Sequence, residues 1–411
     1  MPTISRTLQD DALARLCAVP AVAAGGRALL VSELFPPDVG GTAVLFHGIY
    51  SRLPDTDVHV LTDGLPAPSP QKVRASQLAV YRQPLATSHW GVIDPRGLWR
   101  HARLAWRLRR LISRRRGVVH CARALPEGVA AMLARLTGGP RYVCWAHGED
   151  VAMALSSREY TWLTKAVYRW SAGALANSRN TATMLAALGV PDRKITIVYP
   201  AVDADRFHPR VDGREVRRRY AGDGDILLLS VGRLQRRKGH DVAIQAVAAL
   251  CDAVPNLRYV IAGNGEERER LERLVDEHQL RDCVFFAGTV ADEELPAHYA
   301  ASDIFLLPNR IDEGDLEGFG IVFLEAAAAA RPVIGGDSGG VPEAVERNVT
   351  GLLVDGSSVT LVTEAIRDLA GSAERRRRMG LAGRVRAERC FSWERAAAAV
   401  FDVQRRLAAD R

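Results

Sequence analysis

Two glutamates, eight residues apart, are the most informative chemical groups in this chain of 411 residues. Glu317 is followed directly by Gly-Phe-Gly at 318–320, and Glu325 follows an apolar run at 321–324. Glycines let a backbone approach a ligand closely, and the free N–H groups of a helix that begins near Phe319 attract oxygen atoms. Because carboxylates accept hydrogen bonds from neighbouring hydroxyls, this stretch predicts a site for a phosphorylated sugar. The alternative is a glycine-rich turn before a core helix, with two solvated glutamates.

A pair of cations, Arg233 and Lys238, forms a second candidate group. Both lie in the predicted turn between a strand over 225–231 and a helix that begins near His240. Cations near a helix N-terminus can neutralise a diphosphate, so the pair predicts binding of such a group. The alternative is two basic residues on a surface loop.

The first half of the chain has two weaker candidates. His147 follows a predicted strand over 141–146, and Gly40 and Gly41 end the loop after a predicted strand over 27–32. In a doubly wound sheet, ligands bind outside the carboxyl ends of the strands, so both segments are placed to meet a ligand. The alternatives are a structural histidine and glycines required only by the turn.

Strands and helices alternate along both halves of the sequence. Predicted strands span 27–32, 57–61, 78–81, 118–121, 141–146, 174–177 and 195–198, and then 225–231, 258–262, 283–287, 303–307, 332–334 and 351–354. This pattern predicts α/β domains with parallel sheets covered by helices on both faces. The length favours two domains, and the proline-bounded segment 199–209 reads as their linker. We expect domains over 1–200 and 201–390, with a helix over 391–411 that packs back on the first domain.

Charge is distributed unevenly between the two halves. Residues 1–200 carry 25 Lys and Arg against 13 Asp and Glu, a net charge of +12, whereas residues 201–411 carry 30 against 35, a net charge of −5. An excess of positive charge indicates an anionic partner for the first half, whether lipid, acceptor or nucleic acid.

The segment 96–116 concentrates this charge, with nine arginines and no acidic residue. Helical spacing places six of them on one stripe: Arg96, Arg100, Arg103, Arg107, Arg110 and Arg114. Leu98, Ala105, Leu108 and Ile112 fall on the opposite side and are expected to pack on the sheet, and Trp99 and Trp106 lie at the flank. Arginines beside tryptophans are typical of a helix at an anionic membrane surface. The alternative is a solvated face of an arginine-rich protein.

Composition narrows the class of protein. Apolar residues make up 47% and charged residues 25% of the chain, as in soluble globular proteins. We find no apolar stretch long enough to cross a bilayer and no basic start of a secretory signal, and six scattered cysteines indicate buried, reduced thiols. The expected location is the cytoplasm, peripheral at the inner face of the cell membrane.

Several segments together resemble one family. VGRLQRRKGHDVAI, IAGNGEE, GTVADEELPAHYAASDIFLLPN, EGFGIVFLEAAAAARPVIGGDSGGVPEAV and GLLV stand in the order and at the separations seen in retaining glycosyltransferases of family 4, which have the GT-B fold. YPAVDADRFHP is similar to that family's PxGVDxxxFxP, with Ala201 where glycine is usual. The second half resembles bacterial phosphatidylinositol mannosyltransferases and enzymes of capsule and exopolysaccharide synthesis, and the first half is matched more thinly.

The resemblance implies two Rossmann-like doubly wound domains that face a central cleft, the first binding the acceptor and the second the nucleotide sugar. It also implies roles for single residues. Arg233 and Lys238 would hold the diphosphate of the donor, and Glu317 the hydroxyls of its sugar. Residues implied to bind other parts of the donor are Gly40, Gly41, Gly263, Thr289, Val290, Phe319, Gly320, Ile321 and Glu325, the last toward the ribose. His147 would reach toward the transferred sugar.

The implied reaction moves a hexose, of mannose or glucose type, from a GDP- or UDP-sugar to a lipid-linked or oligosaccharide acceptor, with retention at the anomeric carbon. We expect no cofactor and no metal, because Arg233 and Lys238 supply the positive charge, and no nucleic-acid partner. One rival is a nucleotide-sugar epimerase or a phosphorylase on the same fold, although a phosphorylase needs a late cofactor lysine and no lysine follows Lys238. Another rival is a non-enzymatic binder of anionic polymers.

Overall fold

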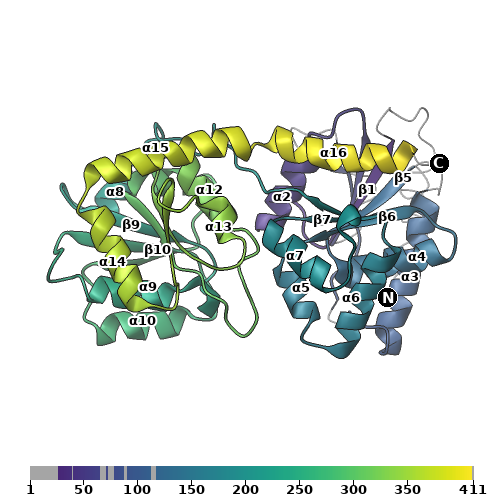
Figure 1. Ribbon diagram of the computed structural model, residues 1–411, viewed down its shortest axis with the longest axis horizontal. Helices are drawn as coiled ribbons and strands as arrows, with labels where there is room; N and C mark the ends of the chain where they lie inside the picture. Colours follow the sequence, from purple (N-terminus) through teal and green to yellow (C-terminus); the bar gives the residue numbers. More distant parts are fainter. Residues whose placement is uncertain are drawn as a thin grey trace, which may run out of the picture. The chain divides into compact units, whose positions relative to one another are not determined.

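The computed structural model describes residues 26–38, 40–64, 78–87, 90–112 and 117–409, and the backbone of 71–72. The chain divides into two compact units. Unit 1 comprises residues 1–199 and 393–411, and unit 2 comprises residues 200–392 (Figure 1). The last helix therefore belongs to the same unit as the first strands.

Unit 1 is built on an eight-stranded sheet with the order β3-β4-β2-β1-β5-β6-β7-β8. Its strands are β1 Arg27–Ser32, β2 Asp57–Thr62, β3 Gln71–Lys72, β4 Ala79–Arg82, β5 Gly117–Cys121, β6 Arg141–Ala146, β7 Gly173–Ala176 and β8 Ile195–Ile197. Only the β3–β4 pair is antiparallel, and β1 lies in register between β2 and β5. The central strands are buried on both faces, as their continuous apolar runs predict.

Helices cover both faces of this sheet (Figure 1). They are α2 Gly41–Tyr50, α3 Pro95–Leu111, α4 Val129–Leu136, α5 Glu149–Ala154, α6 Arg158–Trp170, α7 Arg179–Ala187 and α16 Trp393–Ala409, with short segments η1 Ala124–Gly128 and η2 Asp192–Lys194. One face packs against α3, α4 and α6 in a single apolar cluster. On α2, Gly48 allows close packing, since a Cβ there would lie 2.3 Å from the ring of Trp393 in α16.

Helix α16 is held to the sheet by buried hydrogen bonds. The amide of Gln404 meets His120 Nε2 at 2.9 Å and donates to the carbonyl of Arg27 at 3.1 Å. His120 Nδ1 lies 2.8 Å from the hydroxyl of Tyr50, which also accepts from the indole of Trp145 at 3.0 Å. Because these groups satisfy one another inside the core, they fix how α2 and α16 sit on the strands.

Unit 2 contains a six-stranded parallel sheet with the order β11-β10-β9-β12-β13-β14. Its strands are β9 Ile226–Val231, β10 Leu257–Ala262, β11 Val284–Gly288, β12 Ile304–Leu307, β13 Val333–Gly336 and β14 Gly351–Val354. Its helices are α8 Arg214–Tyr220, α9 His240–Ala248, α10 Arg268–Glu277, α11 Leu295–Ala301, α12 Ile321–Ala328, α13 Val341–Ala344, α14 Val359–Ala370 and α15 Ala373–Cys390, with the short turn η3 Arg236–Lys238. On β12, Leu306 belongs to the cluster with α9 and α14, and the Phe305 ring packs on Tyr299 and Phe323 of α11 and α12.

The predicted fold class is confirmed, since both units are α/β with parallel Rossmann-like sheets. Two expectations about segment 96–116 are corrected. The helix α3 begins at Pro95, where the carboxylate of Asp94 caps it, and ends at Leu111, and Arg114 lies outside the described residues. Leu98 is 46% exposed, because the buried stripe runs through Gly97, His101, Ala105 and Leu108, one residue away in phase.

The expectation of buried cysteines holds for only part of the described set. Cys121 and Cys144 are buried and lie opposite each other on β5 and β6, whereas Cys251 and Cys390 are exposed. Where the chain is described, no helix is both long enough and apolar enough to cross a bilayer.

Candidate active site

The candidate site lies at the carboxyl ends of β9 and β12 in unit 2. The strand order runs outward from β9 to β10 and β11 on one side, and from β12 to β13 and β14 on the other. The point where the direction of the chain order reverses is the usual ligand site of such a sheet. Arg237 and Lys238 follow β9, and Asn309 and Glu317 follow β12, so the sequence brings four polar side chains to this point.

Glu317 is the centre of this cluster. Its Oε2 atom accepts from Arg237 Nη1 at 3.0 Å, from Asn309 Nδ2 at 3.0 Å and from the ammonium of Lys238. Arg237 Nε also lies 2.9 Å from an Asp315 carboxylate oxygen. The side chains of Lys238, Arg237 and Glu317 are only 10%, 9% and 13% exposed, so their charges interact with little screening.

The cluster keeps Glu317 ionised. Burial pushes the pKa of Glu317 upward, but Lys238 and Arg237 outweigh it and hold that pKa below its ordinary value. Among the described residues, all assigned hydrogen bonds to this carboxylate go to Oε2. The second oxygen, Oε1, is therefore available to accept from a hydroxyl.

The Gly-rich loop after Glu317 has a conformation that requires glycine. Gly320 has a φ of +88°, and a Cβ at this position would lie 2.5 Å from the Phe323 ring. The carbonyl of Glu317 accepts from the N–H of Gly340 at 2.9 Å, which ties the loop to the turn after β13. Helix α12 starts at Ile321, two residues later than predicted, and its first N–H groups have no partner within the helix.

Glu325 occupies a separate environment one turn into α12. Its Oε2 accepts from the hydroxyl of Tyr299 at 2.7 Å. Burial raises the pKa of Glu325 to about 7, against the opposing influence of Tyr299 and of the more distant Arg206. This carboxylate therefore titrates near neutral pH, unlike Glu317.

Other predicted donor residues lie along the same sheet edge. Gly263 follows β10 and donates its N–H to the carbonyl of Gly288 at 2.7 Å, and a Cβ on Gly263 would lie 1.8 Å from the carbonyl of Gly232. Thr289 and Val290 come directly after β11, with Thr289 exposed. Arg233 follows β9, but its side chain is exposed and stands outside the ion pairs assigned to Glu317.

In unit 1, His147 lies at the carboxyl end of β6, and the Gly40–Gly41 pair lies at the start of α2. His147 Nε2 lies 3.0 Å from the carbonyl of Ala122, which can only accept, so Nε2 carries the proton. Burial lowers the pKa of His147, and the imidazole is neutral at pH 7. Gly40 is the residue before α2, and a Cβ there would meet no atom within 4 Å.

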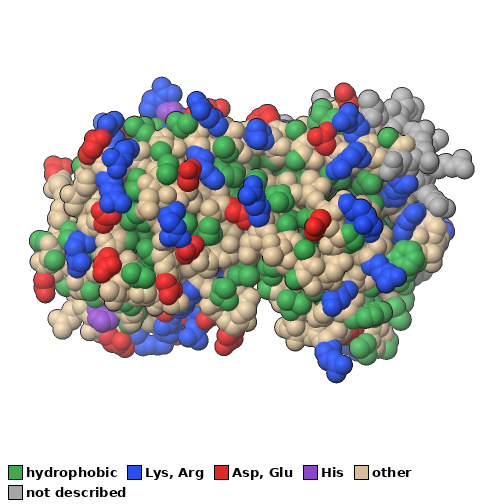
Figure 2. Space-filling model, in the orientation of Figure 1, with side chains coloured by type: hydrophobic (Ala, Val, Ile, Leu, Met, Phe, Trp, Pro, Cys, Tyr) green, Lys and Arg blue, Asp and Glu red, His purple; other side chains and the backbone are tan. Residues whose placement is uncertain are grey.

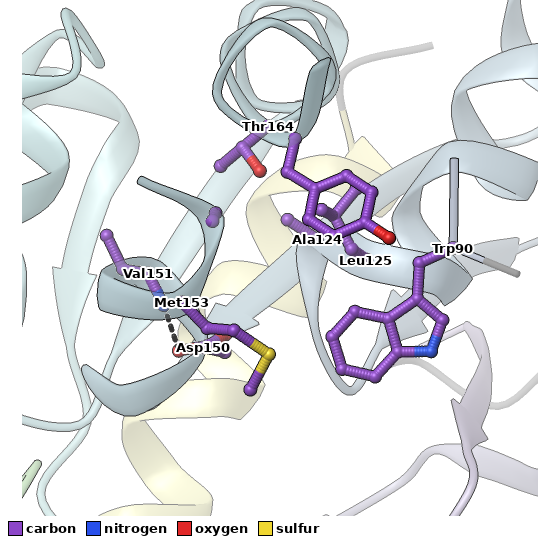
Figure 3. Close-up of a pocket in the computed structure, with 9 residues that line it drawn as sticks. Trp90, Ala124, Leu125, Asp150, Val151, Met153 and Thr164 are labelled. Carbon is purple, nitrogen blue, oxygen red and sulfur yellow. Dashed lines mark hydrogen bonds between the residues drawn. The ribbon is translucent and has the colours of Figure 1, made fainter. Parts of the chain in front are cut away.

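A small hollow adjoins the turn after His147. Figure 3 shows Trp90 on one side of it and Val151 and Met153 on the other, with the carboxylate of Asp150 accepting from the N–H of Val151. Asp150 also accepts from the N–H of His147 at 2.8 Å. The lining is mainly apolar, so the hollow lacks the convergent cations of the unit 2 cluster.

Helix α3 presents the predicted basic and aromatic residues at the surface. Trp99 and Trp106 are 61% and 50% exposed, and they stack under the guanidinium groups of Arg103 and Arg110 at 5.3 and 3.8 Å. Arg100 is also exposed, whereas Arg107 is half-buried and donates to Gln83. Figure 2 shows hydrophobic and basic side chains intermixed over the lower part of unit 1, where Figure 1 draws α3 and α6.

Three residues of the unit 2 site were not predicted: Arg237, Asn309 and Tyr299. Arg237 stands in a run of three basic residues, where the sequence gives no sign of which one is buried. Asn309 comes two residues after β12, and a polar residue at the carboxyl end of a buried strand was a usable signal. In the described ranges, we find no group of three or more His, Cys or acidic side chains that could hold a metal ion.

Two Rossmann-like units, with the polar cluster of unit 2 at the reversal point of its sheet, define a GT-B glycosyltransferase fold. Residues 39–206 match the family profile described as Glycosyltransferase Family 4, and residues 214–386 match Glycosyl transferases group 1. The chain belongs to this family of glycosyltransferases.

Individual relatives and structures agree with this assignment. The chain is 34% identical over 389 residues to the GDP-mannose-dependent alpha-(1-6)-phosphatidylinositol monomannoside mannosyltransferase of Mycobacterium tuberculosis, covering 92% of this chain and 98% of that protein. It is 35% identical over 221 residues to the D-inositol 3-phosphate glycosyltransferase of Streptomyces avermitilis, covering 51% and 46%. The structure of a sucrose-phosphate synthase from Thermosynechococcus elongatus has the same fold, with a TM-score of 0.79 and 22% identity over 94% of this chain and 100% of that chain.

Proposed function

We propose that the protein is a retaining hexosyltransferase that moves a mannose or glucose from a GDP- or UDP-sugar to a lipid-linked or oligosaccharide acceptor of a cell-envelope glycan. The observation that carries this proposal is the buried cluster of Arg237, Lys238 and Asn309 around Glu317. GDP-mannose is the first candidate for the donor, because this chain is similar over almost its whole length to the GDP-mannose-dependent mannosyltransferase of M. tuberculosis.

The cluster suits a leaving diphosphate. In the proposed reaction, the bond between the anomeric carbon and the phosphate oxygen breaks, and its electron pair stays on the phosphate. The acceptor oxygen forms a bond to the same face of that carbon, and its proton passes to the departing phosphate. Lys238, Arg237 and the exposed Arg233 would stabilise the growing negative charge, so no metal is needed for this purpose.

The carboxylates have different proposed roles. The free oxygen of Glu317 would accept from a hydroxyl of the donor sugar, while Lys238 turns partly toward the phosphate. Glu325 would accept from the ribose hydroxyls, next to backbone N–H groups of Phe319, Gly320 and Ile321. The roles proposed for Gly40, Gly41, Gly263, Thr289, Val290 and His147 remain predictions of the family resemblance.

Peripheral contact with an anionic membrane is part of this proposal, with the protein in the cytoplasm at the inner face of the membrane. It is supported by the exposed tryptophans and stacked arginines of α3. Tryptophan favours the interfacial layer, and guanidinium groups are attracted to acidic lipids.

The direct test is a panel of nucleotide sugars assayed for release of nucleoside diphosphate, with and without membrane extract as acceptor. We expect one donor to be hydrolysed slowly alone and faster with acceptor, and Lys238→Ala to lose both activities. Lys165→Ala, an exposed lysine of unit 1, is the matched control. Equal turnover by Lys238→Ala and Lys165→Ala would remove the proposed site. Release of a sugar epimer without any acceptor dependence would favour the epimerase instead.

A further inference from the structure

A second ion pair, separate from the cluster around Glu317, joins the segments that follow β9 and β12. Arg310 lies in the segment after β12, and Asp241 is the second residue of α9. Both terminal nitrogens of the Arg310 guanidinium donate to the Asp241 carboxylate, each to a different oxygen and each at 2.9 Å. The two side chains are 13% and 16% exposed. A bidentate pair of this kind fixes the relative direction of its partners as well as their distance.

Arg310 also holds the cationic turn η3 through its main chain. Its N–H donates to the carbonyl of Arg237 at 2.9 Å. Two residues after Arg237, Gly239 has a φ of +72°, and a Cβ there would lie 2.1 Å from the carbonyl oxygen of Pro308. The turn therefore lies directly on the segment that follows β12, and Lys238 stands between the two contacts.

The charge of Arg310 is balanced within the pair. Asp241 accepts from Arg310 and also from Arg270 Nη2, at 3.1 Å. Burial pushes the pKa of Asp241 upward, but the two arginines outweigh it and hold that pKa below its ordinary value. Asp241 is thus ionised and keeps the Arg310 guanidinium directed toward α9.

We propose that Asp241 and Arg310 are positioning residues of the donor site. They hold the η3 turn against the end of β12, and so place the Arg237 guanidinium and the Lys238 ammonium where the diphosphate of a nucleotide sugar binds. Cations that stabilise a developing charge must be in place before the ligand arrives, and small displacements weaken them. The pair acts on the donor only through these two cations. This proposal rests on the proposed function, because it assigns the pair to the site of that donor.

A purely structural role of the pair leads to a different expectation. An acidic residue in the first turn of a helix stabilises that helix whatever ligand is bound, so its loss would lower the affinity for all nucleotides alike. A positioning role acts selectively on the phosphate groups. GDP has one phosphate more than GMP, so the ratio of the two affinities reports on the placement of the cations.

The test is isothermal titration of the full chain with GDP and GMP, replaced by UDP and UMP if the donor panel identifies a UDP-sugar. We expect Asp241→Asn and Arg310→Gln each to weaken GDP by about tenfold or more and GMP by less than about threefold. The double variant should bind GDP about as weakly as either single variant, because both substitutions remove the same contact.

Arg270→Gln is the matched control. It also removes an arginine bonded to Asp241, but this arginine is 41% exposed and its other assigned partner is Glu267. We expect it to change either affinity by no more than about twofold, as for an exposed ion pair. Arg310→Lys keeps the charge but replaces two parallel donors by one point charge, so its GDP affinity should lie between wild type and Arg310→Gln.

The proposal is overturned if Asp241→Asn and Arg310→Gln, with unchanged melting curves, bind GDP as tightly as wild type. It is also overturned if their affinities for GDP and GMP fall by the same factor, or if Arg270→Gln weakens GDP as much as Arg310→Gln does. Tighter binding of GDP by Asp241→Asn, together with weaker binding by Arg310→Gln, would make Arg310 itself a phosphate ligand and equally contradict the positioning role.

Lys238→Ala in the same titrations separates this proposal from the proposed function. If Lys238→Ala loses affinity for GDP while Asp241→Asn and Arg310→Gln keep it, only the positioning role is eliminated. If Lys238→Ala binds GDP as tightly as wild type, the donor site is contradicted, and with it the proposed function.

Discussion

Each sheet has a buried glutamate near its reversal point, and the two glutamates differ in the number and distance of their cationic partners. In unit 2, one oxygen of Glu317 accepts from Arg237, Lys238 and Asn309. In unit 1, the carboxylate of Glu127 has one arginine 3.9 Å away and one oxygen without a hydrogen bond to any described residue. Burial raises the pKa of Glu127, and Arg123 only partly opposes it, whereas two cations hold the pKa of Glu317 down.

This difference suggests a division of tasks. Through its Oε2 atom, Glu317 fixes the positions of two buried cations before a ligand arrives, which is what stabilisation of a developing charge requires. Glu127 has its assigned cation, Arg123, at 3.9 Å, which is beyond hydrogen-bond distance, so it does not fix a charge in this way. The same topology therefore provides a preorganised charged site in unit 2 and a buried carboxylate with one distant cation in unit 1.

The largest expected effect is on sugar transfer by Glu317→Ala. Loss of this carboxylate frees Lys238 and Arg237 to move and removes the acceptor for a sugar hydroxyl, so we expect kcat/KM to fall by about 10²–10³-fold, as for loss of an oxyanion-hole donor. The comparison is sharpened with Glu127→Gln, which should lower the rate of donor hydrolysis far less, because it frees neither buried cation of unit 2. Identical kinetic defects in the two variants would show that the two sites do not have separate tasks.

Substitution of the two carboxylates should have different effects on the free energy of unfolding. Glu317→Ala leaves two buried cations without their partner, and we expect a loss of about 3 kcal/mol or more in the free energy of unfolding at pH 8. Glu127→Gln should be neutral or stabilising at pH 8, because it removes a buried carboxylate whose assigned cation lies 3.9 Å away, and the amide oxygen can still accept from the N–H of Glu33. Urea unfolding monitored by circular dichroism measures both, and a Glu127→Gln variant less stable than Glu317→Ala would contradict the contrast.

The pH dependence of stability follows from the two pKa directions. Glu317 has a lowered folded pKa, so its contribution is present above the unfolded pKa of about 4.5 and is lost as the pH falls through the folded value. Glu127 has a raised folded pKa, so the folded state holds the proton more tightly and stability declines as the pH rises from about 4.5 through the folded value. The difference in unfolding free energy between Glu127→Gln and wild type should therefore favour the variant more at pH 8 than at pH 4.5.

A smaller effect concerns nucleotide affinity. Glu325 has a pKa of about 7, and only its ionised form accepts from both ribose hydroxyls. Affinity for GDP or UDP should thus fall by up to about tenfold from pH 8 to pH 6, as the ionised fraction falls. Glu325→Gln should keep only the part of this dependence that comes from the phosphate itself. The same slope in both proteins would rule out Glu325 as the ribose partner.

The smallest expected effect is on membrane binding through α3. Arg96→Glu with Arg110→Glu reverses two exposed charges of α3, and sedimentation with vesicles containing acidic lipid should decrease, more at low than at high salt. Unchanged sedimentation would mean that these two arginines are only a solvated part of the helix.

The strands were predictable because they are buried parallel strands, whose apolar runs stand out between helices. Predicted and observed bounds for β6, β10 and β14 differ by at most one residue. The family motifs also pointed to Lys238 and Glu317, which the structure brings into contact. Leu98 was predicted wrongly because a helix of arginines and leucines permits more than one buried stripe, and only packing on the sheet selects the phase.

The burial of two polar residues of unit 1, Gln83 and Glu127, could not be predicted in the same way. Gln83 and Glu127 are separated by 44 positions and stand in segments without a recognisable motif. Their burial depends on where α3 lies relative to the ends of β4 and β5, which is a property of tertiary packing. Arg237 is a similar case. It and its neighbour Arg236 are the same residue type, and only the fold determines that Arg237 is buried and Arg236 is exposed.

That pair of neighbours also provides the sharpest test of the unit 2 site. Isothermal titration measures how tightly Arg237→Ala and Arg236→Ala bind the nucleotide sugar that the donor panel identifies as the substrate. Both substitutions remove one positive charge. We predict a loss of at least about tenfold for Arg237→Ala and almost none for Arg236→Ala. Equal losses in the two variants, or the larger loss in Arg236→Ala, would contradict a donor site organised around Glu317.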